Sequence, residues 1–268
     1  MSERDYVLGT QDDELNRLGF QHQIWRAQAY RIWERADFVP GNRLLDVGCG
    51  PGFATADLSA LVGARGRVTG VDASEKFIDR VKSLNLANVD VSVGDVQELK
   101  GRLPANQFDG AYCRWVLCFV PDPHRVIDAV AESLKPGGRF AIQDYYNYTA
   151  IKLAPKSEIF ARVIRAVELS WRQHGGDPDI GCKLPTMLDR AGLTVTHLEP
   201  IIRFGKPNGS LWQWPTTFFA IFVPTLVKTG FLTVEEQRAF EAEWLARSND
   251  PNSFFSSPPM VDVVAVKR

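Results

Sequence analysis

The sequence predicts an α/β fold built on one mostly parallel, seven-stranded sheet with helices on both faces and a helical cap. Three observations lead to this prediction. From residue 42 to about residue 267, short apolar runs rich in β-branched residues alternate with longer segments of helical period. The first run leads into a glycine-rich turn, which is where doubly wound sheets bind ligands. The 268 residues are 45% apolar, which is enough for one sizeable core, so we expect a single domain over residues 1–268.

The elements follow in alternation. The apolar runs predict strands at residues 43–47, 67–72, 89–93, 108–113, 139–144, 194–203 and 260–267. Apolar residues three and four apart predict helices at residues 53–62, 74–84, 124–134 and 182–191. Ser74 stands at a helix N-cap position, and the Pro136-Gly137-Gly138 turn ends the third helix.

Three segments fall outside this alternation. They are a helical stretch at residues 12–38, a helix at residues 157–174 and an aromatic-rich insertion at residues 205–259. Each is too short for a core of its own. We therefore expect a cap over the sheet, made of an N-terminal part at residues 1–41 and the insertion at about residues 205–259.

Composition excludes several classes of protein. A net charge of -1 gives no field that would draw the chain onto nucleic acid. The polar start lacks the apolar run of a secretory signal, so we expect a cytoplasmic protein. The most apolar stretch, residues 212–227, is shorter than the ~20 residues that span a bilayer and contains Pro215 and Pro224, so we expect no membrane partner. The four cysteines lack zinc-site spacing, so we expect no metal.

The strongest motif is LLDVGCGPG at residues 44–52, a strand that runs into a glycine turn and then a helix. Gly48, Gly50 and Gly52 allow a ligand to approach the main chain closely. A dinucleotide fingerprint would have another glycine where Phe53 stands, and the turn holds no lysine or arginine for phosphates. The expected ligand therefore carries no phosphate at this turn.

Two acidic residues after the next strands indicate an adenosine group. Asp72, in VTGVDAS, lies twenty residues after Gly52, where a carboxylate can accept hydrogen bonds from both ribose hydroxyls. Asp95 and Val96 follow the third strand, at the height where an adenine amino group and ring face would lie. NAD and S-adenosylmethionine both contain adenosine, so these residues alone do not separate them.

The motifs LLDVGCGPG, VDAS, GDV, FDGAYCRWVLCFV and LKPGGRF together resemble, in order and spacing, the landmarks of class I S-adenosylmethionine-dependent methyltransferases. The likeness is to the small-molecule branch that includes ubiquinone-biosynthesis-type enzymes, and it covers residues 42–144 closely. It implies a Rossmann-like sheet in the order 3-2-1-4-5-7-6. It also implies S-adenosylmethionine as cofactor and S-adenosylhomocysteine as product.

The resemblance implies a role for individual residues. The methionine end of the cofactor would lie among Asp46, Gly48, Cys49, Gly50 and Gly52. The ribose would lie at Asp72 and Ala73, the adenine at Asp95 and Val96, and Arg114 would lie close to the cofactor or the substrate. The N-terminal run resembles segments that fold over the cofactor in bacterial members, with closing contacts from Tyr6, Arg17 and Gln21. The alternative is a surface helix on which Arg17 and Gln21 are solvated.

The acceptor is expected to be a small apolar or aromatic metabolite, methylated at an oxygen, nitrogen or carbon atom. Methyl transfer from a sulfonium is an in-line displacement that depends mainly on orientation, and some acceptors also need a general base. Candidates for a catalytic or substrate contact are Tyr145, His22 and His174; Tyr145 is favoured for a substrate contact, and a noncatalytic role is favoured for each histidine. The aromatic residues of the insertion would line an acceptor pocket, form the core of a lid or dock on a membrane surface.

Two other function classes remain open from the sequence. One is an NAD- or FAD-dependent oxidoreductase, which Phe53 and the lack of a recognisable hydride-transfer constellation disfavour. The other is a noncatalytic regulatory protein that binds the cofactor, although the glycines and both aspartates of the motifs are intact. The oligomeric state is open, with a homodimer as one option.

Overall fold

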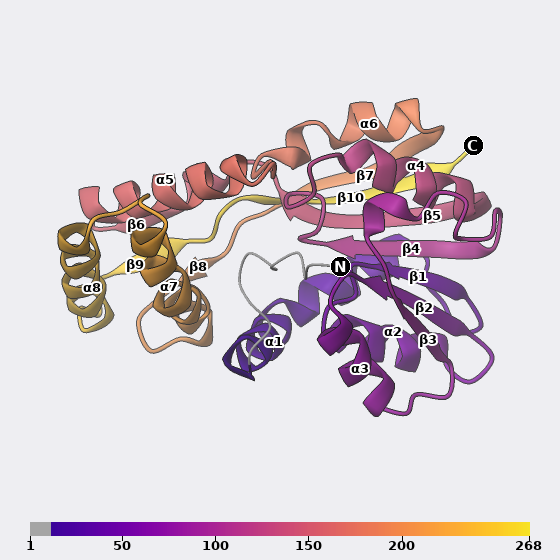
Figure 1. Cartoon of the computed structure of the whole chain (residues 1–268), viewed down its shortest axis with the longest axis horizontal. Coiled ribbons are helices and arrows are strands. Elements are labelled where there is room, and N and C mark those ends of the chain that lie inside the picture. The colour runs from indigo at the N-terminus through magenta and orange to yellow at the C-terminus, as the bar shows by residue number, and fades with distance from the viewer. Residues whose placement is uncertain (1–11) are drawn as a thin grey trace.

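A computed structural model describes residues 12–268 and shows a seven-stranded sheet beside a smaller, mostly helical lobe (Figure 1). Counted along the chain within this sheet, the strands stand in the predicted order 3-2-1-4-5-7-6. Among these described strands, β10 alone runs in the opposite direction to the other six. In spatial order the strands are β3 (Val89–Val93), β2 (Arg67–Asp72), β1 (Arg43–Val47), β4 (Phe108–Arg114), β5 (Leu134–Tyr145), β10 (Met260–Lys267) and β7 (Leu193–Ile201).

Helices cover both faces of this sheet (Figure 1). One face carries α1 (Asp12–Arg35), α2 (Phe53–Val62) and α3 (Glu75–Ser83), and the other carries α4 (Pro123–Ser133) and α6 (Leu184–Arg190). Successive strand residues point to opposite faces, so Leu44 packs with Trp33 of α1, whereas Leu45 belongs to the core on the other side. Ser74 caps α3 as predicted, since its hydroxyl accepts a hydrogen bond from the Phe77 amide.

The remaining segments form the lobe, defined here as residues 148–174 and 204–256 (Figure 1). It contains α5 (Glu158–Gln173), α7 (Ser210–Lys228) and α8 (Val234–Ser248). It also contains a small sheet in the order β6 (Lys152–Ala154), β9 (Phe254–Ser256) and β8 (Phe204–Gly205), which the sequence did not predict. Strands of two and three residues carry too little periodicity to be recognised.

Aromatic side chains hold the lobe together. Phe219 contacts Phe240 and Trp244 with ring centroids 5.0 and 5.2 Å apart, and Trp212 stacks on Trp244 at 4.6 Å. These rings belong to the same continuous core as the α4 side of the sheet. The extra segments after β5 therefore pack on one another beside the carboxyl ends of the strands, whereas the N-terminal segment forms α1 on one face of the sheet (Figure 1).

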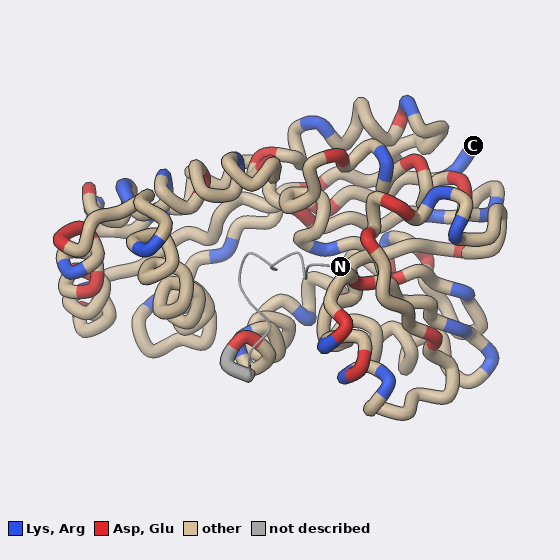
Figure 2. The backbone as a smooth tube through the Cα atoms, viewed as in Figure 1, with Lys and Arg blue, Asp and Glu red and all other residues tan. Residues whose placement is uncertain are grey.

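Charged residues of both signs are interspersed over the sheet half and the lobe (Figure 2). Pro215 and Pro224 lie inside α7. Within residues 12–268, no helix combines the length and the apolar composition needed to cross a bilayer.

Cys49, Cys113 and Cys118 are buried, Cys182 is exposed, and all four are free thiols.

Candidate active site

A cavity of about 580 Å³ lies where the carboxyl ends of β1, β2 and β4 meet α1, α5 and α7. Its wall has two halves of different chemistry. We call the first the polar half, lined by Asp46, Gly48, Cys49, Gly50, Asp72, Ala73, Asp95 and Val96. We call the second the aromatic half, lined by Trp115, Phe119, Tyr145, Tyr148, Trp171, Trp214, Phe218 and Phe219.

The glycine turn shapes the polar half. Gly48 and Gly52 have φ angles of 66° and 85°, in the left-handed region that favours glycine. A Cβ atom on Gly48 would lie 2.4 Å from a methyl group of Val116, and one on Gly52 would lie 2.5 Å from a methyl group of Val81. Gly52 does not line the cavity. It acts through the turn, by directing the chain into α2 so that Phe53 and Ala54 border the cavity.

Asp72 ends β2 with both carboxylate oxygens held by the main chain. The amides of Gly50 and Ser74 each donate a hydrogen bond of 2.9 Å to it. Burial raises the pKa of Asp72, and these two hydrogen bonds oppose that shift. Each oxygen keeps a further lone pair and Asp72 lines the cavity, so a pair of vicinal hydroxyls is a chemically matched ligand.

Asp46, at the end of β1, is a buried carboxyl group in the same half. Burial raises its pKa to about 6, although the Thr55 hydroxyl donates a 2.7 Å hydrogen bond to it and Arg114 lies close enough to lower the pKa. Asp95 follows β3 and accepts a 2.9 Å hydrogen bond from the Gln97 amide, with the buried Val96 beside it. The polar half thus presents three carboxyl groups at the ends of three adjacent strands.

Helix α1 borders both halves of the cavity. Arg17 is buried and forms a two-pronged ion pair with Glu14, with both nitrogen–oxygen distances at 2.7 Å. The Gln21 side-chain oxygen accepts hydrogen bonds from Arg17, at 3.0 Å, and from the Trp214 indole of α7, at 2.9 Å. The alternative of a surface helix with solvated Arg17 and Gln21 is therefore wrong. Tyr6 lies outside the described residues.

His22 and Arg114 contact each other in the wall of the cavity. The Arg114 Nη2 atom lies 3.0 Å from His22 Nδ1, and His22 Nε2 lies 3.0 Å from an Asp57 oxygen. Both ring nitrogens of His22 are therefore occupied, and neither is available to take a proton from a substrate. Burial and the positive charge of Arg114 lower the pKa of His22.

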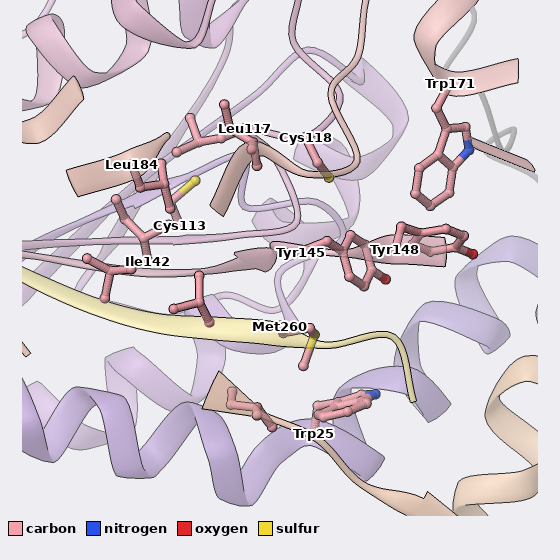
Figure 3. Close-up of a cluster of buried hydrophobic side chains, with 14 of the residues drawn as sticks. Trp25, Cys113, Leu117, Cys118, Ile142, Tyr145, Tyr148, Trp171, Leu184 and Met260 are labelled. Carbon is pink, nitrogen blue, oxygen red and sulfur yellow. The ribbon is translucent and has the colours of Figure 1, made fainter. Parts of the chain in front are cut away.

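The aromatic half is built from rings that contact one another. Trp115 stacks on Tyr145 and on Trp214, with centroids 6.0 and 6.2 Å apart. Tyr145 meets Tyr148 at 5.1 Å, and Trp171 lies 4.6 Å from Tyr148 (Figure 3). Burial raises the pKa of Tyr145 well above its usual value, so its phenol is a hydrogen-bond donor and not a base at neutral pH.

Trp115 reaches this position through an unusual backbone conformation. Its φ angle of 52° lies in the left-handed region, which nonglycine residues rarely adopt and which is enriched at functional sites. Its amide donates to the Gln143 carbonyl, and its indole nitrogen lies 3.0 Å from the Met260 sulfur. These contacts hold the indole ring in the wall of the aromatic half.

Comparison with known proteins identifies the chain. A family model described as a methyltransferase domain matches residues 45–142. A demethylmenaquinone methyltransferase of Bacillus cereus is 30% identical over 201 residues, which cover 68% of this chain and 82% of the relative. The chain belongs to the class I S-adenosylmethionine-dependent methyltransferases. Its cofactor is S-adenosylmethionine, and the oxidoreductase alternative finds no support.

Solved structures agree with this methyltransferase in fold. An S-adenosylmethionine-dependent methyltransferase from Aquifex aeolicus superposes with a TM-score of 0.52 at 21% identity, over 70% of this chain and 92% of the other. Geranyl diphosphate C-methyltransferase from Streptomyces coelicolor gives a TM-score of 0.58 at 16% identity, over 92% of this chain and 77% of the other.

His174 lies at the rim of the methyltransferase cavity. It ends α5, and its Nδ1 lies 2.7 Å from the Ser170 carbonyl, so this nitrogen carries the proton and donates it. The Nε2 lone pair is then unused by that contact. The ring is exposed to solvent, unlike the buried Tyr145. Of the three catalytic candidates, the geometry therefore leaves His174 with a free ring nitrogen at the cavity and Tyr145 with a buried phenol inside it.

Several residues in and behind the cavity wall escaped the sequence analysis. Trp115 directly follows Arg114 in the motif after β4, which was the only signal for it. Trp171 and Tyr148 come from segments with no motif, and Asp57, behind the wall, lies one turn into α2. Of the predicted cofactor residues within residues 12–268, every one except Gly52 lines the cavity.

Proposed function

We propose that this methyltransferase binds the cofactor in the polar half of the cavity and methylates a carbon or oxygen atom of a small, apolar, ring-containing acceptor in the aromatic half. The observation that carries the proposal is the division of one cavity into a wall of carboxylates and main-chain amides and a wall of stacked rings. The Bacillus cereus relative acts on demethylmenaquinone, and an acceptor of that general kind suits the aromatic half.

The residues of the polar half fit the cofactor. Asp72 would accept hydrogen bonds from both ribose hydroxyls, and Asp95 would accept one from the adenine amino group. Val96 would pack on the adenine face. Gly48, Cys49 and Gly50 leave room for the methionine end beside Asp46, with Ala73 next to the ribose. When bound, S-adenosylmethionine supplies an electrophilic methyl group on a sulfonium. The chain's own task is to orient the acceptor against it and to exclude water.

The aromatic half favours an acceptor that reacts without a carboxylate base. Its phenols stay protonated because burial raises the pKa of Tyr145 and Tyr148. The positive charge of Arg17, which is paired with Glu14, opposes that shift at both phenols without reversing it. A protonated amine would find no anionic partner among the aromatic-half residues.

A matched acceptor series tests the proposal. Naphthalene-1,4-diol, 2-naphthol and 2-naphthylmethylamine share one ring system and carry two hydroxyl groups, one hydroxyl group and one amine, respectively. With labelled S-adenosylmethionine, we expect methyl transfer to the diol or the phenol and little to the amine. Preference for the amine, or for acceptors without an apolar ring, would overturn the assignment of the aromatic half. Absence of S-adenosylmethionine binding would overturn the assignment of the polar half.

A further inference from the structure

Three rings of the aromatic half carry hydrogen-bond donors that the protein does not use. Tyr145 ends β5, Tyr148 begins the one-turn helix Tyr148–Ala150, and Trp171 belongs to α5. The two tyrosine rings lie 5.1 Å apart, and Trp171 lies 4.6 Å from one and 6.0 Å from the other (Figure 3). Within residues 12–268 neither phenol oxygen has a hydrogen-bond partner, and the buried indole nitrogen of Trp171 has none either. We call these three side chains the donor cluster.

Other polar rings that line the cavity have partners in the protein. The Tyr112 hydroxyl donates a 2.7 Å hydrogen bond to Gln143. The Trp214 indole donates one of 2.9 Å to Gln21. Buried polar groups are nearly always paired, because an unpaired one loses its hydration without compensation. The donor cluster therefore has unmet donor capacity, and the cavity that it lines gives a ligand access to it.

The main chain fixes the positions of both tyrosines. The Tyr145 amide donates a 2.9 Å hydrogen bond to the side chain of Asp144, and the Tyr148 amide donates one of 3.1 Å to Asp179. Asp144 is fully buried and also accepts from the Cys118 amide, which anchors this end of β5 to the segment after β4. The two hydroxyls are thus preorganised before a ligand arrives.

The chemistry of these groups selects the ligand atom. An indole N–H can only donate a hydrogen bond. Burial raises the pKa of Tyr145 and Tyr148, so each phenol keeps a proton to donate at neutral pH. The matched partner is an oxygen of a hydroxyl, carbonyl or phenolate group, whose two lone pairs can accept from two donors at once. An ammonium or a methyl group in the same place would leave the donors unpaired.

We propose that Tyr145 and Tyr148 are specificity-determining residues whose hydroxyls donate hydrogen bonds to an oxygen substituent on the acceptor ring. This inference rests on the proposed function, which places the acceptor in the aromatic half, and it narrows the acceptor to rings that carry an oxygen. Trp171 packs on both tyrosines and adds a third donor to the cluster. Phe218 and Phe219, in the same half, would pack on the apolar part of the acceptor.

The test compares 2-naphthol with 2-methylnaphthalene, in which a methyl group replaces the hydroxyl at the same position. Equilibrium dialysis of the full chain, saturated with S-adenosylhomocysteine, gives the Kd of each ligand. Tyr145→Phe and Tyr148→Phe remove only a hydroxyl and should each raise the Kd of 2-naphthol about 3- to 10-fold, and the double variant about 10- to 100-fold. None of them should raise the Kd of 2-methylnaphthalene more than about twofold.

Tyr30→Phe is the matched control, because Tyr30 is an exposed tyrosine of α1 outside the cavity lining. This variant should change neither Kd. Thermal unfolding and the Kd of S-adenosylhomocysteine, measured for every variant, separate misfolding or damage to the polar half from a local effect. The two tyrosines are changed one at a time, so each single variant keeps the inference testable if the other does not fold.

Two results would overturn this inference alone. Equal losses for both ligands would mean that the tyrosines act through packing, and the proposed function would stand. An unchanged Kd of 2-naphthol in the double variant would mean that the acceptor oxygen does not meet these hydroxyls. If the wild-type chain bound S-adenosylhomocysteine but neither ring compound, the proposed role of the aromatic half would fall together with this inference.

Discussion

The two halves of the cavity are built in different ways. The polar half comes from one stretch of chain, residues 46–96, at the ends of three adjacent strands, and it uses main-chain amides and short acidic side chains. The aromatic half gathers large rings from β4, β5, α5 and α7, which are up to about a hundred residues apart along the chain. The polar half is thus local and the aromatic half nonlocal, so substitutions should affect one without the other.

The largest difference in effect between the two halves is expected from Asp72→Ala. The variant loses the carboxylate that accepts hydrogen bonds from the amides of Gly50 and Ser74 and that we propose to bind the ribose hydroxyls. Because two charge-assisted hydrogen bonds are lost at once, the Kd of S-adenosylmethionine should rise at least about 100-fold by calorimetry. Asp90→Ala, an exposed aspartate on β3, is the matched control. A Kd within about threefold of wild type would refute the role of Asp72.

Phe218→Ala should act on the other half alone. Phe218 lines the aromatic half and contacts Trp171, with ring centroids 6.4 Å apart. Loss of this apolar wall should lower kcat/KM for the ring acceptor about 10- to 30-fold, while the Kd of the cofactor stays within about twofold. Phe231→Ala, another partly buried lobe residue, controls for stability. A parallel fall in cofactor affinity would show that the halves are not separable.

Asp46→Asn tests the polar half through the pH dependence of protein stability. Burial raises the pKa of this carboxyl to about 6, so its ionised form destabilises the free protein above that pH, and the effect disappears below the unfolded-state value of about 3.8. Without cofactor, the variant should be more stable than wild type at pH 7.5, by at most about 3 kcal/mol, and equal to it near pH 4.

The same variant should bind the cationic cofactor about 10-fold more weakly at pH 7.5, because the negative charge of Asp46 is gone. Urea unfolding and calorimetry at both pH values measure the two effects. The introduced amide retains an oxygen that can accept from the Thr55 hydroxyl, so local packing should be preserved. If stability and affinity fell together at pH 7.5, the carboxyl would have a structural role only.

The smallest effect is expected far out in the lobe, at Thr233→Ala. Thr233 and Glu236 form a capping box at the start of α8, each bonding to the main chain of the other. Loss of the cap should cost about 1 kcal/mol of stability in urea unfolding and leave both ligand constants unchanged. A change in cofactor affinity would indicate that the lobe and the polar half are coupled through α5 or α7.

The sequence predicted the sheet and the polar half because both depend on local rules. Strand and helix periods, the glycine turn and the aspartates after β2 and β3 are each read within a few residues. The aromatic half and the lobe depend on which rings meet in space, as Trp115 and Trp171 do around Tyr145. No spacing rule connects residues 115, 145 and 171, so the contacts among their rings could not be predicted from the sequence.

The two candidate histidines illustrate the same limit of prediction from sequence. The sequence offered His22 and His174 as equivalent candidates, and only the structure separates them. His22 is enclosed between Asp57 and Arg114, and His174 hydrogen-bonds the last turn of its own helix at the rim. Burial and the charge of a partner from another element decide whether an imidazole is a base or a link.

The double hydrogen bond on Gln21 has a consequence for the order of events in turnover. This one oxygen accepts from Arg17 within α1 and from Trp214 on α7, so α1 cannot move away from the lobe without breaking the link between the two walls. With the cofactor placed in the polar half as proposed, a displacement of α1 large enough to free it would open the aromatic half as well. We therefore expect both products to leave through a common gate, so that their release rates rise and fall together.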